Sequence, residues 1–399
     1  MEYAARMDFR FTEEQEMVRD SARKFAKAWA PKMDAFHAGA LKGELDRTFF
    51  REFAEAGFAG SLIPEKYGGS EMGLTPLAIA METMATEGVG SVLNMLTQMN
   101  SLCILRAGPD ALREKYLPKV ASGETVQAFA ITEPDAGSNS FKMKTVAERR
   151  GDEVVLNGTK TFITGVDVVD HVLVIARSMP YEERKAKGLP KTAGFNVVMV
   201  DPKAEGFSMT EVPTRGIEGM RQWTLHFDDV VVEDVVGEEH NGIMPMFDVL
   251  NAERTLAASA ALGMTQRLLD RAVEYAKDRG VFGDRKIGSY QAIQHPLAEV
   301  KCKLEAVRLM FYRCATMFDQ NASPLEIGPQ ATMCKYLAGE LAIEAADHAL
   351  QTFGGNGFSS EYGLIDDYVH ARLLRTAPIS REMVLNQVAE HVLGLPRSY

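Results

Sequence analysis

Residues 130–139 read AITEPDAGSN, and they separate a helix-rich N-terminal third of the chain from a strand-rich middle. Pro134 cannot continue a helix, and Gly137 permits backbone conformations that other residues avoid. A small, polar, bent segment of this kind leaves backbone N–H groups and the hydroxyls of Thr132 and Ser138 free for a ligand. The same residues also make a good generic turn, so they indicate a binding site only in combination with later motifs.

The composition limits the classes of protein that this chain can belong to. It has 399 residues, which suggests about two to three domains, and 46% of them are hydrophobic. The net charge of −11 argues against a general nucleic-acid-binding protein. Since there is neither a leading signal segment nor a long apolar run, we expect a cytoplasmic protein outside the membrane. The four scattered cysteines and eight histidines lack metal-ligand spacing, so we expect buried thiols and no metal site.

Three regions differ in hydrophobic periodicity, and we expect each to be a domain. Residues 1–125 and 241–399 have helical periodicity, whereas residues 126–240 contain short β-type runs. The order therefore predicts an α+β fold with helices first, a β domain second and a helical bundle last. The short runs predict strands at residues 154–156, 172–175, 195–200 and 225–232.

Residues typical of caps and turns mark further boundaries. Thr12 and Gln15 predict a capping box at the start of the first helix. Asn-Gly at residues 157–158 predicts a hairpin turn. The charged run at residues 181–191 predicts an exposed loop, and the glycine-rich residues 354–357 predict a tight loop between helices.

Five motifs, taken in their order along the chain, resemble those of the acyl-CoA dehydrogenase flavoprotein family. The resemblance covers nearly the whole sequence. It implies an N-terminal helical domain, a middle β-barrel-like domain and a C-terminal four-helix bundle. It also implies FAD as cofactor and a homotetramer. The motifs are PEKYGG at 64–69, AITEPDAGSN at 130–139, NGTKTFIT at 157–164, DRGVFG at 278–283 with QAIQ at 291–294, and QTFGGNGF at 351–358.

The resemblance also implies which residues bind the cofactor. Phe129, Ile131 and Thr132 would line the flavin ring, and Phe162 and Thr164 would contact it from the other side. Taken singly, such residues are equally typical of strand cores, solvated helix ends and helix caps. An anionic pyrophosphate favours a guanidinium and a closely approaching glycine backbone. Further residues that would contact FAD, most of them in a neighbouring subunit, are Arg279, Phe282, Gln291, Gln351, Gly354, Gly355 and Ser380.

The catalytic base is expected at an unusual position. Most family members carry a glutamate at a fixed distance after the glycine-rich motif, and here that position is Pro378 or, counted from the C-terminal end, Ala377. Neither can accept a proton. A minority branch, which includes isovaleryl-CoA and long-chain dehydrogenases, places the base on an earlier helix, and Glu253 matches that position. We therefore predict that Glu253 is the base; a solvated carboxylate paired with an arginine is the alternative. Arg254 would orient the substrate or form a plain salt bridge.

Proline at position 378 raises a second question about the expected site. In the family the backbone N–H at this position helps to bind the thioester carbonyl, and proline has no N–H. Either Ala377 or Ile379 supplies the N–H instead, or the site that stabilises the enolate is altered.

Two further residues are expected at the substrate. Ser138 matches a position near the thioester arm. Residues 91–105 match the helix that lines the acyl tunnel, and Gln98 and its polar neighbours would favour a short or polar acyl group. Alternatively, this polar face is buried against another helix or meets solvent, and methionines on another face line the tunnel.

The resemblance implies a reaction and its partners. The expected activity is FAD-dependent α,β-dehydrogenation of an acyl-CoA to a trans-2-enoyl-CoA in fatty acid metabolism, with electrons passing to an electron-transferring flavoprotein. The alternatives are an atypical reaction on the same scaffold, such as enoyl-CoA reduction or β-elimination, and a catalytically silent protein that binds FAD or acyl-CoA.

Overall fold

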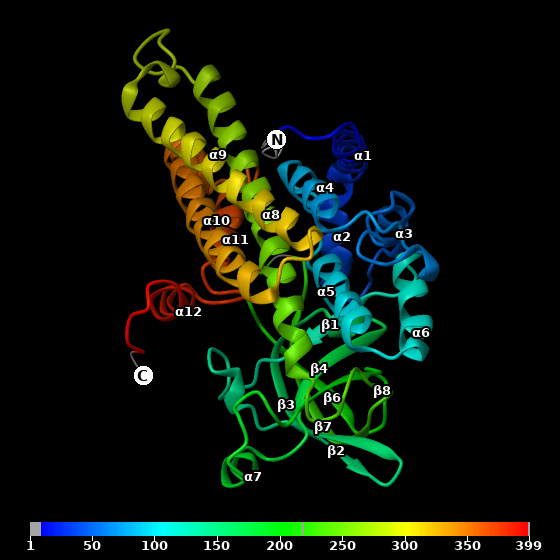
Figure 1. Cartoon of the computed structure of the whole chain (residues 1–399). Helices are drawn as coiled ribbons and strands as arrows, with labels where there is room; N and C mark the ends of the chain where they lie inside the picture. The colour runs from blue at the N-terminus through cyan, green and yellow to red at the C-terminus, as the bar shows by residue number, and fades with distance from the viewer. Residues whose placement is uncertain (1–8, 218, 398–399) are drawn as a thin grey trace, which may run out of the picture.

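The order of the elements divides the chain into three parts (Figure 1). The computed structural model describes residues 9–217 and 219–397. Within these residues a group of helices comes first, then the strands of one mixed sheet, then a bundle of long helices. This order confirms the predicted α+β fold, with the strands placed between two helical parts.

The N-terminal part is a set of helices packed around aromatic rings. Thr12 caps the first helix and the Gln15 side chain bonds back to its backbone, which confirms the predicted capping box. Trp29, Phe36 and Phe49 are almost fully buried, and the ring centroids of Trp29 and Phe49 lie 4.9 Å apart. These rings hold the short helices together. The helices are α1 (Glu13–Trp29), α2 (Met33–Ala40), α3 (Arg47–Glu55), α4 (Leu74–Thr86), α5 (Val92–Ala107) and α6 (Asp110–Ala121).

The middle part is one mixed sheet in the order β6-β7-β3-β2-β4-β5-β8, with β1 parallel to β4. The central strands β4 and β5 are buried almost throughout, as their largely apolar sequences favour. The four predicted strands are confirmed by β3, β4, β5 and β7, although β7 ends at Val231, one residue before the predicted end. The strands are β1 (Gln127–Ala130), β2 (Val146–Arg150), β3 (Glu153–Thr164), β4 (His171–Arg177), β5 (Phe195–Val200), β6 (Phe207–Val212), β7 (Gln222–Val231) and β8 (Asp234–Val235).

The predicted hairpin turn at residues 157–158 is wrong. Strand β3 continues through both residues, and its register against β7 shifts between Leu156 and Gly158. Gly158 has φ +138°, and a Cβ built on it would lie 2.7 Å from the Cα of Thr145. The Asn-Gly pair therefore serves a β-bulge at a close backbone approach, which uses the same freedom of glycine as a turn.

The predicted exposed loop at residues 181–191 is wrong in its first half. Residues Tyr181–Ala186 form helix α7, with acidic residues in the first turn and basic residues in the last. That charge order suits the helix dipole. Arg184 is buried, and its guanidinium donates to the Leu189 carbonyl, so part of this charged run folds back on itself.

The C-terminal part is built on two long helices, α8 and α10, that run in the same direction. Asn251 near the start of α8 donates to the carbonyl of Pro324, the first residue of α10, at 3.0 Å. Tyr275 near the end of α8 stacks on Phe353, the last residue of α10, with ring centroids 4.0 Å apart. Helices α9 and α11 pack beside them and complete the bundle. The helices are α8 (Ile243–Asp278), α9 (Gln291–Asp319), α10 (Pro324–Phe353), α11 (Leu364–Leu373) and α12 (Arg381–Gln387).

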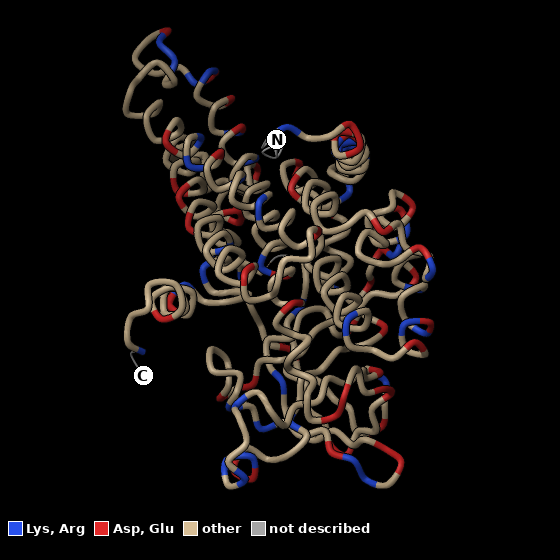
Figure 2. The backbone as a smooth tube through the Cα atoms, viewed as in Figure 1, with Lys and Arg blue, Asp and Glu red and all other residues tan. Residues whose placement is uncertain are grey.

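The glycine-rich residues after α10 form the predicted tight loop. They fold into the short 3-10 helix Gly354–Phe358, and Gly354 has φ +60°. Three of the cysteines are buried as expected, but Cys302 is exposed on α9 because it lies on the outer face of that helix. Figure 2 shows acidic and basic residues interspersed along the backbone of all three parts.

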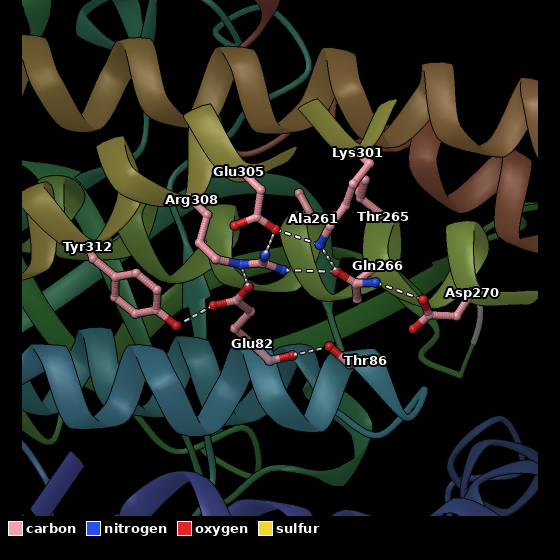
Figure 3. Close-up of polar contacts among 10 residues, drawn as sticks. All are labelled: Glu82, Thr86, Ala261, Thr265, Gln266, Asp270, Lys301, Glu305, Arg308 and Tyr312. Carbon is pink, nitrogen blue, oxygen red and sulfur yellow. Dashed lines mark hydrogen bonds and ion pairs between the residues drawn. The ribbon is translucent and has the colours of Figure 1, made fainter. Parts of the chain in front are cut away.

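A buried carboxylate joins the N-terminal helices to the bundle (Figure 3). Glu82 of α4 accepts a hydrogen bond from Arg308 Nε of α9 at 2.7 Å and another from the hydroxyl of Tyr312. Arg308 also contacts Gln266 of α8 and Glu305 of α9. The network therefore ties helices from two parts of the chain together.

The described part of the chain has neither a membrane-spanning helix nor a metal-binding cluster. No helix there is long and apolar enough to cross a membrane. No cluster of three or more histidine, cysteine or acidic side chains there could hold a metal ion.

Candidate active site

The two segments expected to contact the flavin lie side by side at the edge of the sheet. The N–H of Thr161 donates to the carbonyl of Thr132 at 2.9 Å. The Lys160 ammonium donates to the carbonyl of Ile131, also at 2.9 Å. Phe129, Ile131 and Thr132 are all half-buried. The structure thus brings together residues that are separated by about 30 positions in the sequence.

Phe162 has the most solvent-exposed apolar side chain in these two segments. Its side chain is 58% exposed, and its backbone has φ +56°, a region that aromatic residues rarely adopt. Next to it, Thr164 bonds through its hydroxyl to Gln222 at 3.0 Å. The exposed ring of Phe162 lies on a strained backbone beside half-buried apolar groups. Together they form the kind of surface that a planar ring system such as a flavin would cover.

A buried ion pair that the sequence analysis missed supports this surface. Glu133 accepts from Lys160 at 2.9 Å and from the backbone N–H groups of Lys144 and Thr145 at 2.6 and 3.0 Å. Burial favours the neutral carboxyl, but these contacts outweigh it and hold the pKa of Glu133 below its ordinary value. The signal in the sequence was a single lysine inside an otherwise strand-like run.

Glu253 lies about three turns into α8 and is 7% exposed. Burial raises the pKa of its carboxyl to about 7, against the opposing charges of Arg254 and Lys335. The Arg254 guanidinium donates instead to the Asn251 side chain at 3.0 Å. Within the described residues the Glu253 carboxylate has no hydrogen bond or ion pair, which differs from the alternative of a solvated, paired carboxylate.

The loop that contains Pro378 connects α11 to α12 and is held by Lys335 of α10. The Lys335 ammonium donates to the carbonyls of Leu374 and Ile379 at 2.8 and 2.7 Å. The N–H of Ala377 is used within the loop, since it donates to the carbonyl of Leu373 at 2.9 Å. The N–H of Ile379 has no acceptor among the described residues.

Ser380 ends this α11–α12 loop as the N-cap of α12. Its hydroxyl accepts from the N–H of Met383 at 3.4 Å, and its side chain is half-buried. The expected contact between Ser380 and FAD stays a prediction.

The remaining cofactor candidates lie at the far end of the bundle, away from the sheet (Figure 1). Asn356 donates to the Tyr275 hydroxyl at 3.0 Å, so the glycine-rich loop lies against the end of α8. Phe282 is 90% exposed, and a Cβ built on Gly354 or Gly355 would meet no atom within 4 Å. The exposed candidates at this end are Arg279, Phe282, Gln291, Gln351, Gly354 and Gly355.

This far end is too distant to share one flavin site with Glu253 of the same chain. At 1.5 Å per residue, Arg279 lies roughly 40 Å from Glu253 along α8, much further than one FAD molecule reaches. The structure therefore does not bring the two sets of cofactor candidates together within one chain.

The two expected substrate contacts differ in their surroundings. Ser138 is exposed on the bent segment. Gln98 is 1% exposed and donates to the carbonyl of Ala59 at 2.9 Å, while Asn100 donates to Ala128. This polar face of α5 is therefore packed against neighbouring elements, in agreement with the alternative interpretation of it. Contact between Gln98 and an acyl chain stays a prediction.

Comparisons with known proteins cover the whole fold. The chain matches the models of the acyl-CoA dehydrogenase N-terminal domain at residues 12–124, middle domain at 128–230 and C-terminal domain at 240–393. It is 39% identical to Acyl-CoA dehydrogenase FadE12 of Mycobacterium tuberculosis, over 98% of this chain and all of that one. It is 34% identical to the Caffeyl-CoA reductase-Etf complex subunit CarC of Acetobacterium woodii, over 88% and 91% of the two chains.

A solved structure agrees with these matches. The glutaryl-coenzyme A dehydrogenase–glutaryl-CoA complex superposes with a TM-score of 0.88 at 30% identity, over 98% of both chains. The exposed ring of Phe162 on a strained backbone, the bent polar segment and the open glycine-rich loop all fit an FAD cofactor. The chain belongs to the acyl-CoA dehydrogenase family of FAD-dependent oxidoreductases.

Proposed function

We propose that this chain oxidises the Cα–Cβ bond of an acyl-CoA thioester to a trans-2-enoyl-CoA, with Glu253 as the base that removes the α proton. Bound FAD supplies the acceptor for the hydride that leaves Cβ. The observation that carries the proposal is a buried, unpaired carboxyl on α8 in a chain that has proline at the more common position of the base.

The surroundings of Glu253 suit proton abstraction. An exposed carboxylate is a weak base, whereas a pKa of about 7 leaves a large fraction of the group ionised near neutral pH and strengthens it as a base. The absence of a hydrogen bond or ion pair at this carboxylate, within the described residues, leaves it free to meet the substrate. Arg254, held by Asn251, adds a positive charge beside it.

The negative charge that develops on the thioester oxygen needs a hydrogen-bond donor. Pro378 has none, and the N–H of Ala377 is occupied by Leu373. Of the two N–H groups on either side of Pro378, that of Ile379 has no acceptor among the described residues, so we assign it the role of the backbone donor. Such a donor lowers the energy of the transition state most when the loop is fixed beforehand.

The two separated sets of cofactor residues support an oligomer with shared sites. Phe129, Ile131, Thr132, Phe162, Thr164 and Ser380 would hold the flavin end of FAD. The far-end residues of a second subunit would hold its pyrophosphate and adenosine. We propose that this arrangement is a homotetramer, and that an electron-transferring flavoprotein takes the electrons. The relative named as an Etf complex subunit supports that partner.

Reduction of an enoyl-CoA is the second candidate. The relative named caffeyl-CoA reductase favours it, because its chain aligns with most of this one. The same base and donor would serve the reverse direction, with Glu253 returning a proton to the α carbon.

Anaerobic titration of the purified FAD-containing protein tests the proposal. Propionyl-, isovaleryl-, octanoyl- and palmitoyl-CoA are added in turn while the absorbance of oxidised flavin is followed. We expect one class of acyl-CoA to bleach the flavin. If none does so but an enoyl-CoA reoxidises the chemically reduced flavin, the second candidate holds. If neither occurs while FAD stays bound, the protein carries out a different reaction or only binds these ligands.

A further inference from the structure

Lys335 is a buried lysine whose role the family resemblance did not identify. It lies on α10, is 3% exposed, and donates to two backbone carbonyls, those of Leu374 and Ile379. These carbonyls lie on either side of Pro378, so one ammonium holds both sides of the α11–α12 loop. The loop includes Ile379, whose N–H is the proposed carbonyl donor.

Helix α10 holds this loop at two further points. Glu340 accepts from Arg375 through both carboxylate oxygens, at 2.8 and 2.7 Å. A Cβ built on Gly339 would lie 2.9 Å from the carbonyl oxygen of Leu374, so the loop backbone packs directly on the helix. Lys335 is the most buried of the polar groups that make these contacts.

Lys335 also acts on the proposed base through its charge. The charged groups around it are Glu253 and Arg254 of α8 and Glu340 of its own helix. Burial lowers the pKa of Lys335 to about 8, while the positive charge of Lys335 helps to hold down the pKa of Glu253. A buried ammonium costs free energy, and two carbonyls alone could be satisfied by a neutral donor. The charge therefore needs a reason beyond holding the loop.

We infer that Lys335 is a positioning residue that couples the two halves of the reaction. It fixes the α11–α12 loop so that the N–H of Ile379 can meet the thioester carbonyl, and its positive charge acts through space on the Glu253 carboxylate. The inference rests on the proposed function, because it assumes that these two groups act on the same acyl-CoA.

The test compares three variants of Lys335 with the wild type and a matched control. Lys335→Met removes both the charge and the donors, Lys335→Gln keeps a donor without the charge, and Lys335→Arg keeps both. The control is Lys303→Met, which removes a lysine of α9 that pairs with Glu344 of α10, away from the loop. Every protein is prepared with FAD bound, and its unfolding temperature is recorded.

The first measurement is binding without turnover. One ligand is a 3-thia-acyl-CoA, which has the thioester carbonyl but no oxidisable Cα–Cβ bond. The other is the matching S-alkyl-CoA thioether, which lacks the carbonyl. We expect Lys335→Met to weaken binding of the first about tenfold relative to the second, the size of one lost hydrogen bond. Lys335→Gln should lose less, and Lys335→Arg and Lys303→Met should keep the wild-type ratio.

The second measurement is the rate of flavin reduction against pH. The carboxylate form of Glu253 is the active base, so the rate rises as this group loses its proton. Removing the neighbouring positive charge raises the pKa of Glu253, and the midpoint should move up by ~0.5 unit or more in Lys335→Met and Lys335→Gln. Lys335→Arg and Lys303→Met should keep the wild-type midpoint.

Equal ligand ratios and equal pH midpoints in all variants, with only a lower unfolding temperature, would show that Lys335 is merely structural. If Lys335→Met does not fold, the contrast between Lys335→Gln and Lys335→Arg decides the same question. If the wild type binds both ligands but none of the acyl-CoA substrates reduces its flavin, the proposed function is contradicted. The ratio of the two binding affinities then still tests whether Lys335 fixes the loop.

Discussion

At the scale of single residues, the proposed site is built from groups that lack their usual partners. Glu253 is buried without an ion pair in the described structure, the N–H of Ile379 has no acceptor there, and Phe162 is exposed at a positive φ. Each of these features lowers the stability of the ligand-free protein. Such features persist where a ligand completes them.

The first prediction concerns the cost of keeping Glu253 buried. The folded pKa of about 7 lies above the ordinary 4.5, so its stabilising effect is complete below pH 4.5 and is lost as the pH rises through 7. Glu253→Gln, which is neutral throughout, should therefore match the wild type near pH 4.5. At pH 8 the free energy of unfolding of the variant should exceed that of the wild type by about 3 kcal/mol.

Urea unfolding of both proteins at the two pH values measures this difference. All other titrating groups are shared, so the comparison isolates one carboxyl. An equal free energy of unfolding at pH 8 would mean that Glu253 is not held in a desolvated site.

Sequence reasoning located Glu253 by its place in a motif, but it did not find Lys335 or the pair of Glu133 and Lys160. Lys335 contacts main-chain carbonyls about 40 positions further along the chain. Contacts of that kind leave no pattern in the sequence, because any residue can supply a carbonyl. The sequence left two candidates, Ala377 and Ile379, for the backbone N–H that meets the thioester carbonyl. Only the backbone geometry shows that the N–H of Ile379 is the one of these two without an acceptor.

At the scale of elements, packing between helices places the site more firmly than any one helix could. Helix α4 contacts α8 and α9, and α8 carries Glu253. The start of α1 followed from its capping box, and the predicted strands in β3, β4, β5 and β7 followed from hydrophobic periodicity. The bulge in β3 and helix α7 did not, because a turn and a bulge use the same Asn-Gly pair, and a charged run suits a loop or a helix equally well.

The second prediction concerns the link between α4 and α9. Glu82→Gln removes the charge that Arg308 and Tyr312 contact, and it leaves the guanidinium in a largely buried position. We expect the free energy of unfolding to fall by about 3 kcal/mol.

The matched control is Glu305→Gln, which removes another carboxylate partner of Arg308. The side chain of Glu305 is 52% exposed, so this change should cost less than ~1 kcal/mol. Chemical denaturation of the three proteins gives both values. Equal losses in the two variants would contradict the view that burial makes Glu82 the stronger link.

At the scale of the whole molecule, the cofactor candidates occupy opposite ends of α8. Sequence motifs predicted both groups, yet no motif states how far apart they lie. If both groups bind FAD, the length of the helix places them too far apart for one chain to hold both ends of one molecule, so two chains must combine. The oligomer is thus a requirement of the proposed cofactor site.

The third prediction tests whether sites are shared between subunits. Phe162→Asp should lose FAD because it removes the ring proposed to contact the flavin, and Arg279→Glu should lose it because the proposed pyrophosphate site then carries a like charge. When the two variants are co-expressed so that both occur in one assembly, the mixed assemblies should bind more FAD than assemblies of either variant alone. A site formed by one subunit's Arg279 and the other's Phe162 would then be intact.

The flavin content per chain, measured by absorbance, reports this complementation. Arg285→Glu, a change of the same charge in the same exposed loop, should keep its FAD and serves as the control. If mixed assemblies bind no more FAD than the separate variants, each site lies within one chain and the proposed sharing is wrong.

The most direct test of the central claim is a single-turnover comparison of the wild type with Glu253→Gln. Each FAD-loaded protein is mixed anaerobically with the acyl-CoA that bleaches the wild type, and the absorbance of oxidised flavin is followed. We expect the variant to bind FAD and the acyl-CoA normally but to reduce its flavin roughly 10²- to 10⁴-fold more slowly, the contribution of a general base. Reduction at the wild-type rate would show that another group removes the α proton.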